Sequence, residues 1–264
     1  MALGLRSAIG SDVGRRRTAN EDSGAAGDRL LVVADGMGGH AHGELASALT
    51  VSAMLAMDER LPADAGELDL LAELTAAVDD ASAKLAAHAQ QDPDTQGMGT
   101  TVVTLLLDGE RLALAHVGDS RIYLCRAGVL TQITHDHTMV QQLVDEGQIT
   151  PEEALVHPRR SVLMRALSTD HPVEADLAFL DLQLGDRYLL CSDGVTAVLP
   201  DQAILDLMAA PTSPEVVVEQ LITLANEGGG PDNITAVVAD VVDAAEVVSQ
   251  PVRLVGAAAE MQIR

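Results

Sequence analysis

The amino-acid sequence predicts an α/β protein (α+β in arrangement), a four-layer α/β/β/α sandwich of two antiparallel sheets flanked by helix pairs. Three observations predict this class. Hairpin signals join short apolar runs, which indicates antiparallel strands. Helical segments come in pairs, and groups of strands alternate with them along the chain. The chain has 264 residues, of which 47% are apolar, so it can bury a sizeable core.

Strands begin the chain, and a helix pair follows them. Apolar runs predict strands over residues 3–12 and 29–34. Apolar residues that recur at helical spacing predict a helix over 43–60. A second helix is expected over about 67–90, because Asp92-Pro93 ends it.

The middle of the chain is expected to form a meander and an insertion. Four strands are predicted, over residues 100–107, 111–116, 121–126 and 130–133. Asp108-Gly109 joins the first two as a hairpin turn, because both residue types tolerate positive φ. The pattern then turns helical and polar, which indicates an inserted subdomain over about residues 135–170.

The last part of the chain returns to strands and a helix pair. Strands are predicted over 177–182, 187–191 and 233–242, with helices over 201–208 and 214–226. The remaining residues are rich in Ala and Val without strong periodicity. We therefore expect one domain over residues 1–242 and a C-terminal tail or linker over 243–264.

The charge of the chain excludes several functions. Its formal net charge of −24 argues against binding to nucleic acid and against an anionic membrane as main partner. A phosphate substrate would be repelled unless bound cations reversed the local charge, so an acidic phosphate enzyme implies metals. No apolar stretch reaches the roughly 18 residues needed to span a bilayer, and we find no secretory signal. We expect a cytoplasmic monomer that does not insert into membranes.

The two cysteines, Cys125 and Cys191, lie in apolar strand-like runs. We expect buried thiols in a reducing cytosol and neither a disulfide nor a nucleophile. A thiol phosphatase would need an arginine six positions after its cysteine to hold the phosphate, and neither cysteine has one.

Four aspartates stand beside a glycine or asparagine at turns that adjoin apolar runs: Asp35, Asp119, Asp193 and Asp232. Strand ends that bring carboxylates together, with glycine letting the backbone come close, form a site for a hard metal ion. Oxygen donors without sulfur suit Mg²⁺ or Mn²⁺ better than Zn²⁺. A single Asp-Gly pair is also a common turn signal, so the prediction depends on all four.

The motifs around these aspartates form an ordered series: Arg17-Thr18-Ala19-Asn20-Glu21-Asp22, Asp35-Gly36-Met37-Gly38-Gly39-His40, Gly99-Thr100-Thr101, Val117-Gly118-Asp119-Ser120-Arg121, Ser192-Asp193-Gly194 and Gly230-Pro231-Asp232-Asn233. This series resembles the metal-dependent serine/threonine protein phosphatases of type 2C, the PPM family, in its bacterial branch. The resemblance covers about residues 6–242. It implies that the insertion over 135–170 is a mobile flap beside the active site.

The resemblance implies two catalytic ions, Mn²⁺ or Mg²⁺, and a position for a third. Asp35 would bridge the two catalytic ions, and the Gly36 carbonyl would be a further ligand of one of them. Asp193 and Asp232 would complete the coordination of the other ion. Asp119, together with Asp193, matches the third-metal position.

The resemblance also implies supporting roles around these ions. Asp22, and with it Glu21, would hold metal-bound waters. Arg17 would clamp the substrate phosphate with its planar fork of donors. Its fixed distance to the Asn-Glu-Asp motif selects it over its two neighbouring arginines, which read as surface residues. Asn233 would orient Asp232 or close the turn as structural support.

The general acid stays open between two candidates. Eukaryotic relatives carry a histidine directly after the Asp-Gly pair, where this sequence has Met37. His40 lies nearby, but it opens the helix predicted from residue 43 and can simply help to cap it. Protonation of the leaving group by a metal-bound water is the more economical interpretation.

Two further segments have alternative readings. His135-Asp136-His137 looks like a ligand cluster, but alternate residues of an extended chain face opposite sides, so we expect a hinge into the insertion. Ser161 and the pair Arg159-Arg160 either contact substrate or belong to a solvated face.

The implied activity is hydrolysis of phosphoserine and phosphothreonine on proteins, by attack of a hydroxide that bridges the two ions. The implied partners are phosphorylated proteins, Ser/Thr kinases among them, whose signalling the enzyme would reverse. One alternative is a phosphatase for an anti-sigma-factor antagonist, although such relatives usually carry sensor domains. Another is an inactive metal-binding regulatory relative, which would lack one or more of Asp35, Asp193 and Asp232.

Overall fold

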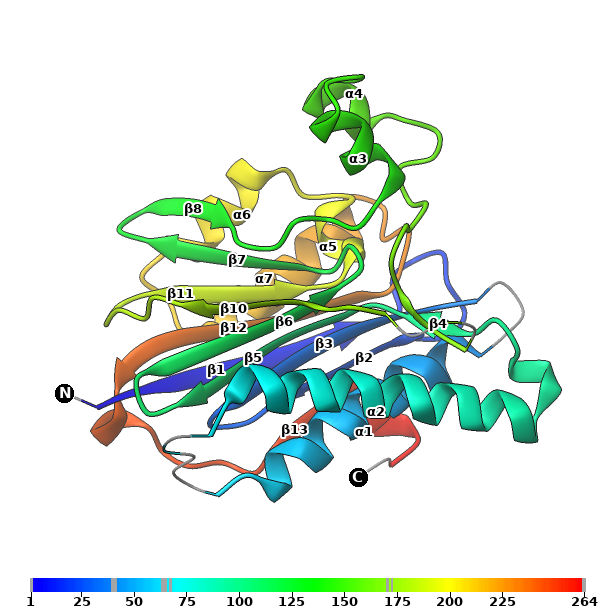
Figure 1. The fold of residues 1–264 in the computed structure, drawn as a ribbon. Coiled ribbons are helices and arrows are strands. Elements are labelled where there is room, and N and C mark those ends of the chain that lie inside the picture. The colour runs from blue at the N-terminus through cyan, green and yellow to red at the C-terminus, as the bar shows by residue number, and fades with distance from the viewer. Residues whose placement is uncertain are drawn as a thin grey trace.

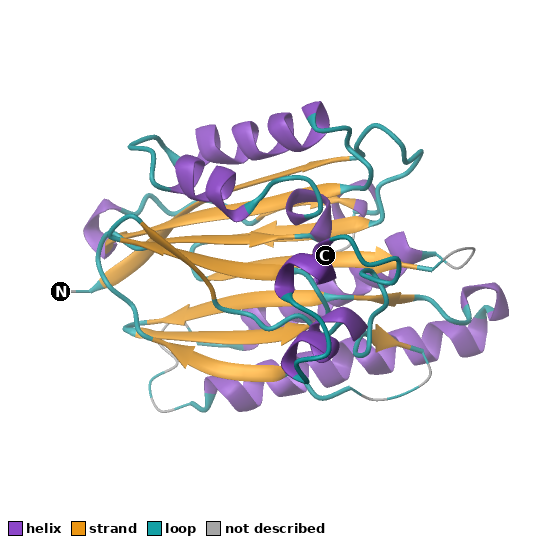
Figure 2. Ribbon diagram, turned by 90° about the horizontal axis from the view of Figure 1, so that it is seen from above, coloured by secondary structure: helices purple, strands orange, loops and turns teal. Residues whose placement is uncertain are grey.

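The computed structural model describes residues 2–38, 42–62, 66, 68–169, 171 and 173–262. Two antiparallel sheets lie face to face, and helices cover both outer faces of the pair (Figure 1, Figure 2). The predicted four-layer α/β/β/α sandwich is therefore confirmed.

The first sheet brings together strands from the two ends of the chain. β1 pairs along its whole length with β12, and the hairpin β7–β8 completes the other edge. Its order is β1 (Leu3–Asp12), β12 (Ile234–Asp243), β11 (Arg187–Cys191), β7 (Arg121–Arg126) and β8 (Val129–Gln132).

The second sheet carries the N-terminal half of the site. Its order is β10 (Asp176–Leu180), β6 (Arg111–Val117), β5 (Val102–Asp108), β3 (Leu30–Met37), β2 (Asp22–Ala26) and β13 (Arg253–Gly256). Two short strands extend it at one end: β4 (Gly99–Thr100) pairs with β3 and with β9 (Leu167–Ser168).

Two pairs of helices form the outer layers. α1 (Gly43–Arg60) and α2 (Leu70–Gln91) cover the second sheet, whereas α6 (Asp201–Met208) and α7 (Pro214–Glu227) cover the first. Short helices α5 (Asp193–Thr196) and α8 (Ala257–Glu260) follow β11 and β13, and single 3-10 turns lie at Pro93–Thr95 and Ala244–Glu246. The insertion contains α3 (Met139–Asp145) and α4 (Pro151–Leu155), which project from the sandwich (Figure 1).

Apolar side chains fill the three spaces between these four layers. Because side chains alternate along a strand, one strand contributes to the apolar layer on each of its faces. On β3, Leu30 and Val32 pack toward α1 and α2, while Leu31 and Val33 pack between the sheets. A strand buried on both faces reads as an unbroken apolar run. Within the described residues, no helix combines the length and apolar character that a bilayer crossing requires.

Two expectations about the chain's path were wrong. The four strands predicted as one meander are divided, because β5 and β6 lie in the second sheet and β7 and β8 in the first. The C-terminal segment is not a free tail throughout, because β13 pairs with β2 and α8 buries Ala257 and Ala258. The limits of the predicted domain, residues 1–242, stay a prediction.

Candidate metal centre

The predicted aspartates meet at one end of the sandwich, where the second sheet contributes residues of two strands and the first sheet contributes residues beside its strand ends. Asp22 begins β2 and is paired directly with Asp35 on β3. Asp193 begins α5 at the end of β11, Asp119 lies two residues before β7, and Asp232 lies two residues before β12. Because β11 pairs with both β7 and β12, these three turns leave the first sheet side by side.

Burial and one another's negative charge raise the pKa values of several of these carboxyl groups. Burial, with the charges of the other aspartates added, raises the pKa of Asp35 well above its usual range. Burial raises the pKa of Asp22 to about 7 and that of Asp193 to about 6, with neighbouring carboxylates adding to both. The pKa of Asp119 is also raised by burial, to about 7, and the charge of Asp193 contributes. Such a cluster needs protons or cations to offset its charge.

The donor set fits a hard divalent cation. Asp22 is fully buried, and its Oδ2 accepts a hydrogen bond from Ser192 Oγ over 2.7 Å. Its Oδ1 is also buried and has no donor among the protein atoms described. A buried carboxylate oxygen without a donor is costly, and a cation or its water would satisfy it. The residues present therefore fit Mn²⁺ or Mg²⁺.

The Asp35-Gly36 peptide is held firmly in place. Thr101 binds the peptide groups on both sides of Asp35, because its Oγ1 accepts from Asp35 N–H over 3.0 Å and its N–H donates to Asp35 O over 2.9 Å. Thr101 Oγ1 also lies 2.7 Å from Ser120 Oγ, beside Asp119. A Cβ atom at Gly36 would overlap the carbonyl oxygen of Gly43, so only glycine lets the start of α1 approach this peptide.

Arg17 reaches the edge of the carboxylate cluster. Its Nη2 lies 2.8 Å from Asp232 Oδ2, and its Nη1 lies 3.5 Å from Glu21 Oε2. The side chain is 45% exposed, so its guanidinium is accessible from solvent. A partly exposed guanidinium beside a metal-type cluster can bind a phosphate with its fork of donors.

Asn233 holds the loop that carries Arg17. Its Oδ1 accepts from Glu21 N–H over 2.8 Å, and its Nδ2 donates to the carbonyl oxygens of Val13 and Ala19, both over 2.9 Å. One buried amide therefore ties residues 13–21 to the turn of Asp232. The roles expected for Asn233, Arg17 and Glu21 stay predictions.

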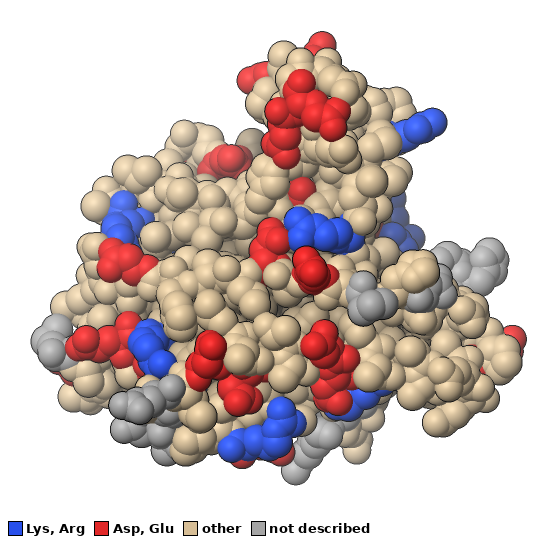
Figure 3. Space-filling view, in the orientation of Figure 1, with Lys and Arg blue, Asp and Glu red and all other residues tan. Residues whose placement is uncertain are grey.

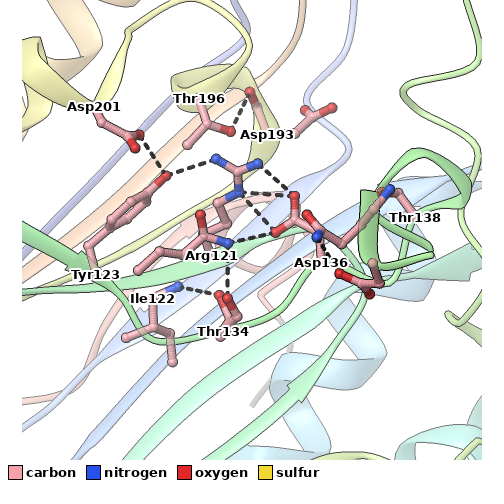
Figure 4. A network of polar contacts seen from close by, with 12 residues as sticks. Arg121, Ile122, Tyr123, Thr134, Asp136, Thr138, Asp193, Thr196 and Asp201 are labelled. Atoms are coloured by element: carbon pink, nitrogen blue, oxygen red, sulfur yellow. Dashed lines mark hydrogen bonds and ion pairs between the residues drawn. The ribbon is translucent and has the colours of Figure 1, made fainter. Parts of the chain in front are cut away.

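Sequence reasoning missed a buried ion pair behind Asp119. Arg121 grips Asp136 with two nitrogens, Nε at 2.9 Å from Oδ1 and Nη2 at 2.6 Å from Oδ2, as Figure 4 shows. Arg121 Nη1 also donates to Tyr123 Oη over 2.9 Å, and that hydroxyl reaches Asp201 at the start of α6. The network joins β7, the entry to the insertion and α6. The only sequence signal for it was the presence of charged residues inside two motifs.

The residues His135-Asp136-His137 do not form one ligand cluster. His135 is exposed and pairs with Asp145 over 2.7 Å, whereas Asp136 is buried against Arg121. His137 is buried in a third direction. The three side chains thus lie in three different surroundings at the entry to the insertion, and the expected hinge stays a prediction.

His137 belongs to a different group, which the sequence did not suggest. One ligand atom each of His116, His137 and Asp176 lies within 4.8 Å of the others, and the two imidazole rings stack with centroids 4.5 Å apart. However, His137 Nδ1 accepts from Gly118 N–H over 3.0 Å, so Nε2 of the neutral ring carries the proton and donates it to Asp176. No lone pair of His137 is left for a metal. We assign the group to hydrogen bonding at the root of the insertion.

The remaining candidates have simpler outcomes. His40 lies outside the described residues. Arg159, Arg160 and Ser161 are exposed on the insertion. Burial and the charge of Asp232 raise the pKa of Asp193, and the positive charge of Arg160 acts in the opposite direction. Arg160 is therefore near enough to the site for its charge to act on Asp193.

The expectation of buried thiols is confirmed, because Cys125 and Cys191 are both free and buried. Burial raises the pKa of the Cys191 thiol to about 12, which leaves it without nucleophilic thiolate near neutral pH.

The surface agrees with an acidic protein. On the face shown in Figure 3, acidic side chains are spread widely and also gather on the insertion, where Asp145, Glu146, Glu152 and Glu153 are exposed. Basic side chains on this face stand singly or in small groups among them. This face therefore lacks the continuous basic surface that nucleic-acid binding favours.

Comparisons with known proteins point to one family. The family profile described as protein phosphatase 2C matches residues 9–227. The serine/threonine protein phosphatase PstP of Mycobacterium tuberculosis is 52% identical over 252 residues, which make up 96% of this chain and 48% of that protein. The chain thus spans about half the length of this relative. The serine/threonine phosphatase Stp of Listeria welshimeri is 34% identical over 235 residues, 87% of this chain and 93% of that protein.

Solved structures agree with the sequence matches. The crystal structure of M. tuberculosis PstP/Ppp matches with a TM-score of 0.85 at 52% identity, covering 90% of this chain and 99% of that one. The catalytic domain of PstP in complex with two manganese ions matches with a TM-score of 0.84 at 52% identity, covering 91% of this chain and all of that one. By sequence and by fold, this chain belongs to the protein phosphatase 2C family.

Proposed function

We propose that this chain is a metal-dependent phosphatase that hydrolyses phosphoserine and phosphothreonine on proteins. The observation that carries the proposal is the meeting of five aspartates from both sheets at one end of the sandwich, with Arg17 at their edge. The similarity to PstP of M. tuberculosis and to Stp of L. welshimeri, which are both named serine/threonine phosphatases, supports it.

The metals would be held by the residues of this centre. Asp35, Asp193, Asp232 and the Gly36 carbonyl would hold two Mn²⁺ or Mg²⁺ ions, and Asp119 with Asp193 would hold a third. The manganese-bound structure of the PstP catalytic domain supports metal dependence. When bound, such ions lower the pKa of water and offset the negative charge of a phosphate.

The protein's own side chains would bind and orient the phosphate. Asp232 holds Arg17 at Nη2, which leaves further N–H groups of the guanidinium for two phosphate oxygens. Asn233 fixes the loop behind Arg17, so the fork need not be ordered at the moment of binding. Asp22 has one oxygen held by Ser192, and its other oxygen, buried and without a donor among the protein atoms described, would hold a metal-bound water.

The substrates would be phosphorylated proteins, among them Ser/Thr kinases whose signalling the enzyme reverses. No observation favours an anti-sigma-factor antagonist as the substrate. An inactive relative is disfavoured, because Asp35, Asp193 and Asp232 are all present and lie at one site. The monomeric state and the cytoplasmic location stay predictions.

A phosphopeptide assay tests the proposal. We expect hydrolysis of p-nitrophenyl phosphate and of phosphothreonine and phosphoserine peptides with Mn²⁺, a lower rate with Mg²⁺, and none in EDTA. A phosphotyrosine peptide of the same sequence serves as the control for substrate class and should react much more slowly. Full activity in EDTA would contradict the proposal.

A further inference from the structure

The C-terminal segment closes on the strand that carries Asp22. β13 pairs with β2 along the edge of the second sheet, with Gly256 opposite Ser23. At the turn into α8, Gly256 has φ +66, and a Cβ atom there would overlap the carbonyl oxygen of Asp22. The segment 253–260 therefore rests directly on the backbone of a residue of the metal centre.

A chain of hydrogen bonds continues from this segment into the protein. Ala258 N–H donates to Ser23 Oγ over 3.0 Å, and Ser23 Oγ lies 2.9 Å from Ser47 Oγ on α1. Ser47 Oγ donates to the carbonyl oxygen of Glu21 over 2.6 Å, a shorter contact than its 3.2 Å to the carbonyl of Glu44. Both serines are fully buried, so no solvent competes for these bonds.

The direction of this chain is fixed by counting hydrogens. Each serine hydroxyl has one hydrogen to donate. Ser47 uses its hydrogen on Glu21, so in the contact between the two serines Ser23 must be the donor. The Ser23 oxygen is then free to accept from Ala258. One arrangement of the hydroxyl hydrogens satisfies every hydrogen bond in the series, and hydrogen bonds linked in this way strengthen one another.

This series of hydrogen bonds ends at the peptide between Asp35 and Gly36, the two predicted metal ligands. The carbonyl oxygen of Glu21 also accepts from Gly36 N–H over 3.1 Å. Gly36 is the residue whose own carbonyl is the expected ligand, and its peptide follows Asp35. Glu21 itself precedes Asp22. The C-terminal segment is thus linked to both sides of the metal centre, once through Gly256 and once through the two serines.

We propose that residues 253–260 position the metal centre, with Ser23 and Ser47 as positioning residues that link the docking of this segment to Asp22 and Gly36. The proposal relies on the proposed function only for the identity of the centre. Because coupling between two binding events is reciprocal, a docked segment tightens metal binding and bound metal tightens docking. Undocking of this segment would therefore lower the affinity for the ions.

Metal titration of point variants tests the proposal. Ser23→Ala and Ser47→Ala should each weaken Mn²⁺ binding by about three- to tenfold in calorimetric titration, the effect expected for one lost hydrogen bond. Gly256→Ala should weaken Mn²⁺ binding at least as much, because its added Cβ atom would overlap the carbonyl oxygen of Asp22. Ser82→Ala is the matched control, because the Ser82 hydroxyl is buried on α2 without a hydrogen-bond partner among the protein atoms described. It should leave the Kd for Mn²⁺ unchanged. A role in folding alone would lower the Tm of the three variants and leave their Kd at the wild-type value, which would overturn the proposal.

Hydrogen exchange on the unmodified chain gives a second test that needs no variant to fold. Saturation with Mn²⁺ should slow amide exchange in residues 253–260, whereas the turn between β7 and β8 at Ala127-Gly128 should be unaffected. Unchanged exchange at 253–260 while Mn²⁺ binds would reject the coupling. A chain that binds Mn²⁺ with this protection but hydrolyses no phosphopeptide would reject the proposed function and leave the coupling intact.

Discussion

Asp22 on β2 and Asp35 on β3 stand directly opposite each other in the second sheet, and the charge of Asp22 adds to the burial that raises the pKa of Asp35 well above its usual range. Burial also raises the pKa of Asp22, to about 7. The metal-free centre therefore holds protons near neutral pH, and a divalent cation would replace them. The two groups titrate as a pair.

Asp35→Asn should abolish phosphatase activity and leave the fold intact. The amide cannot bridge two cations, and loss of such a charge contact typically costs about a hundred- to a thousandfold in kcat. Phosphopeptide kinetics and Mn²⁺ titration measure the two effects. Asp79→Asn, on an exposed position of α2, is the control and should behave as wild type. An active Asp35→Asn enzyme would refute the role given to this residue.

Arg17→Ala should raise the KM for a phosphopeptide more than it lowers kcat. A charge-assisted bond to phosphate contributes about 1.5–3 kcal/mol, which corresponds to roughly ten- to a hundredfold in affinity. Steady-state kinetics with saturating Mn²⁺ give both constants. Arg16→Ala removes the same charge one residue earlier in the chain and should change KM little. Equal effects of the two substitutions would show that only general positive charge matters.

The metal-free chain should be less stable at about pH 8 than at about pH 5. The folded pKa is about 7 for Asp22 and Asp119 and about 6 for Asp193. In the unfolded chain the value is about 3.9, so between these limits the folded state binds more protons. This contribution to stability is complete below about pH 4 and is lost as the pH rises through 7.

Thermal unfolding in EDTA across this pH range measures the effect. Mn²⁺ should raise the Tm more at pH 8 than at pH 5, because it takes the place of the lost protons. Asp119→Asn should flatten the pH dependence in EDTA. A Tm that rises with pH in EDTA would be inconsistent with a carboxylate cluster that repels itself.

Arg121→Ala should destabilise the protein by about 3–5 kcal/mol, because it leaves the buried carboxylate of Asp136 without its charged partner. Urea unfolding measures the change. The double variant Arg121→Met with Asp136→Leu should recover most of the loss, since it removes both charges. If the single and double variants are equally unstable, packing and not the charge of Asp136 explains the loss.

Local pattern was enough to predict most helices and strands. The strand over 3–12, the helix over 43–60 and the strand over 121–126 have the predicted bounds, because periodicity is a property of neighbouring residues. Membership of a sheet is not local, which is why the meander prediction failed. β2 also gave no signal, since Asp22–Ala26 consists of residues with low strand propensity. It is a strand because β3 and β13 pair with both of its edges.

The candidate site was predictable where glycine or asparagine accompanied an aspartate. Asp35, Asp193 and Asp232 carry this signal, although Asp35 lies within β3 and Asp193 begins α5, and the fold brings them to one end. The contacts that support them depend on side chains far apart in the sequence, such as Arg121 with Asp136. The His116–His137 stack likewise forms only because the entry to the insertion lies over β6. The spacing of residues in the sequence does not predict such a pair.

The apolar layer between the sheets bears on the choice of ion. Asp35 and Asp193 come from opposite sheets, so the gap between their oxygens depends on how far side chains such as Val33 and Leu190 hold the sheets apart. Mg²⁺ requires oxygens at about 2.0–2.1 Å, and Ca²⁺ accepts about 2.3–2.6 Å. The preference for an ion of one radius then depends partly on apolar side chains that do not contact the ion. Replacing one of them with a smaller or larger residue should change the relative affinities for Mg²⁺ and Ca²⁺.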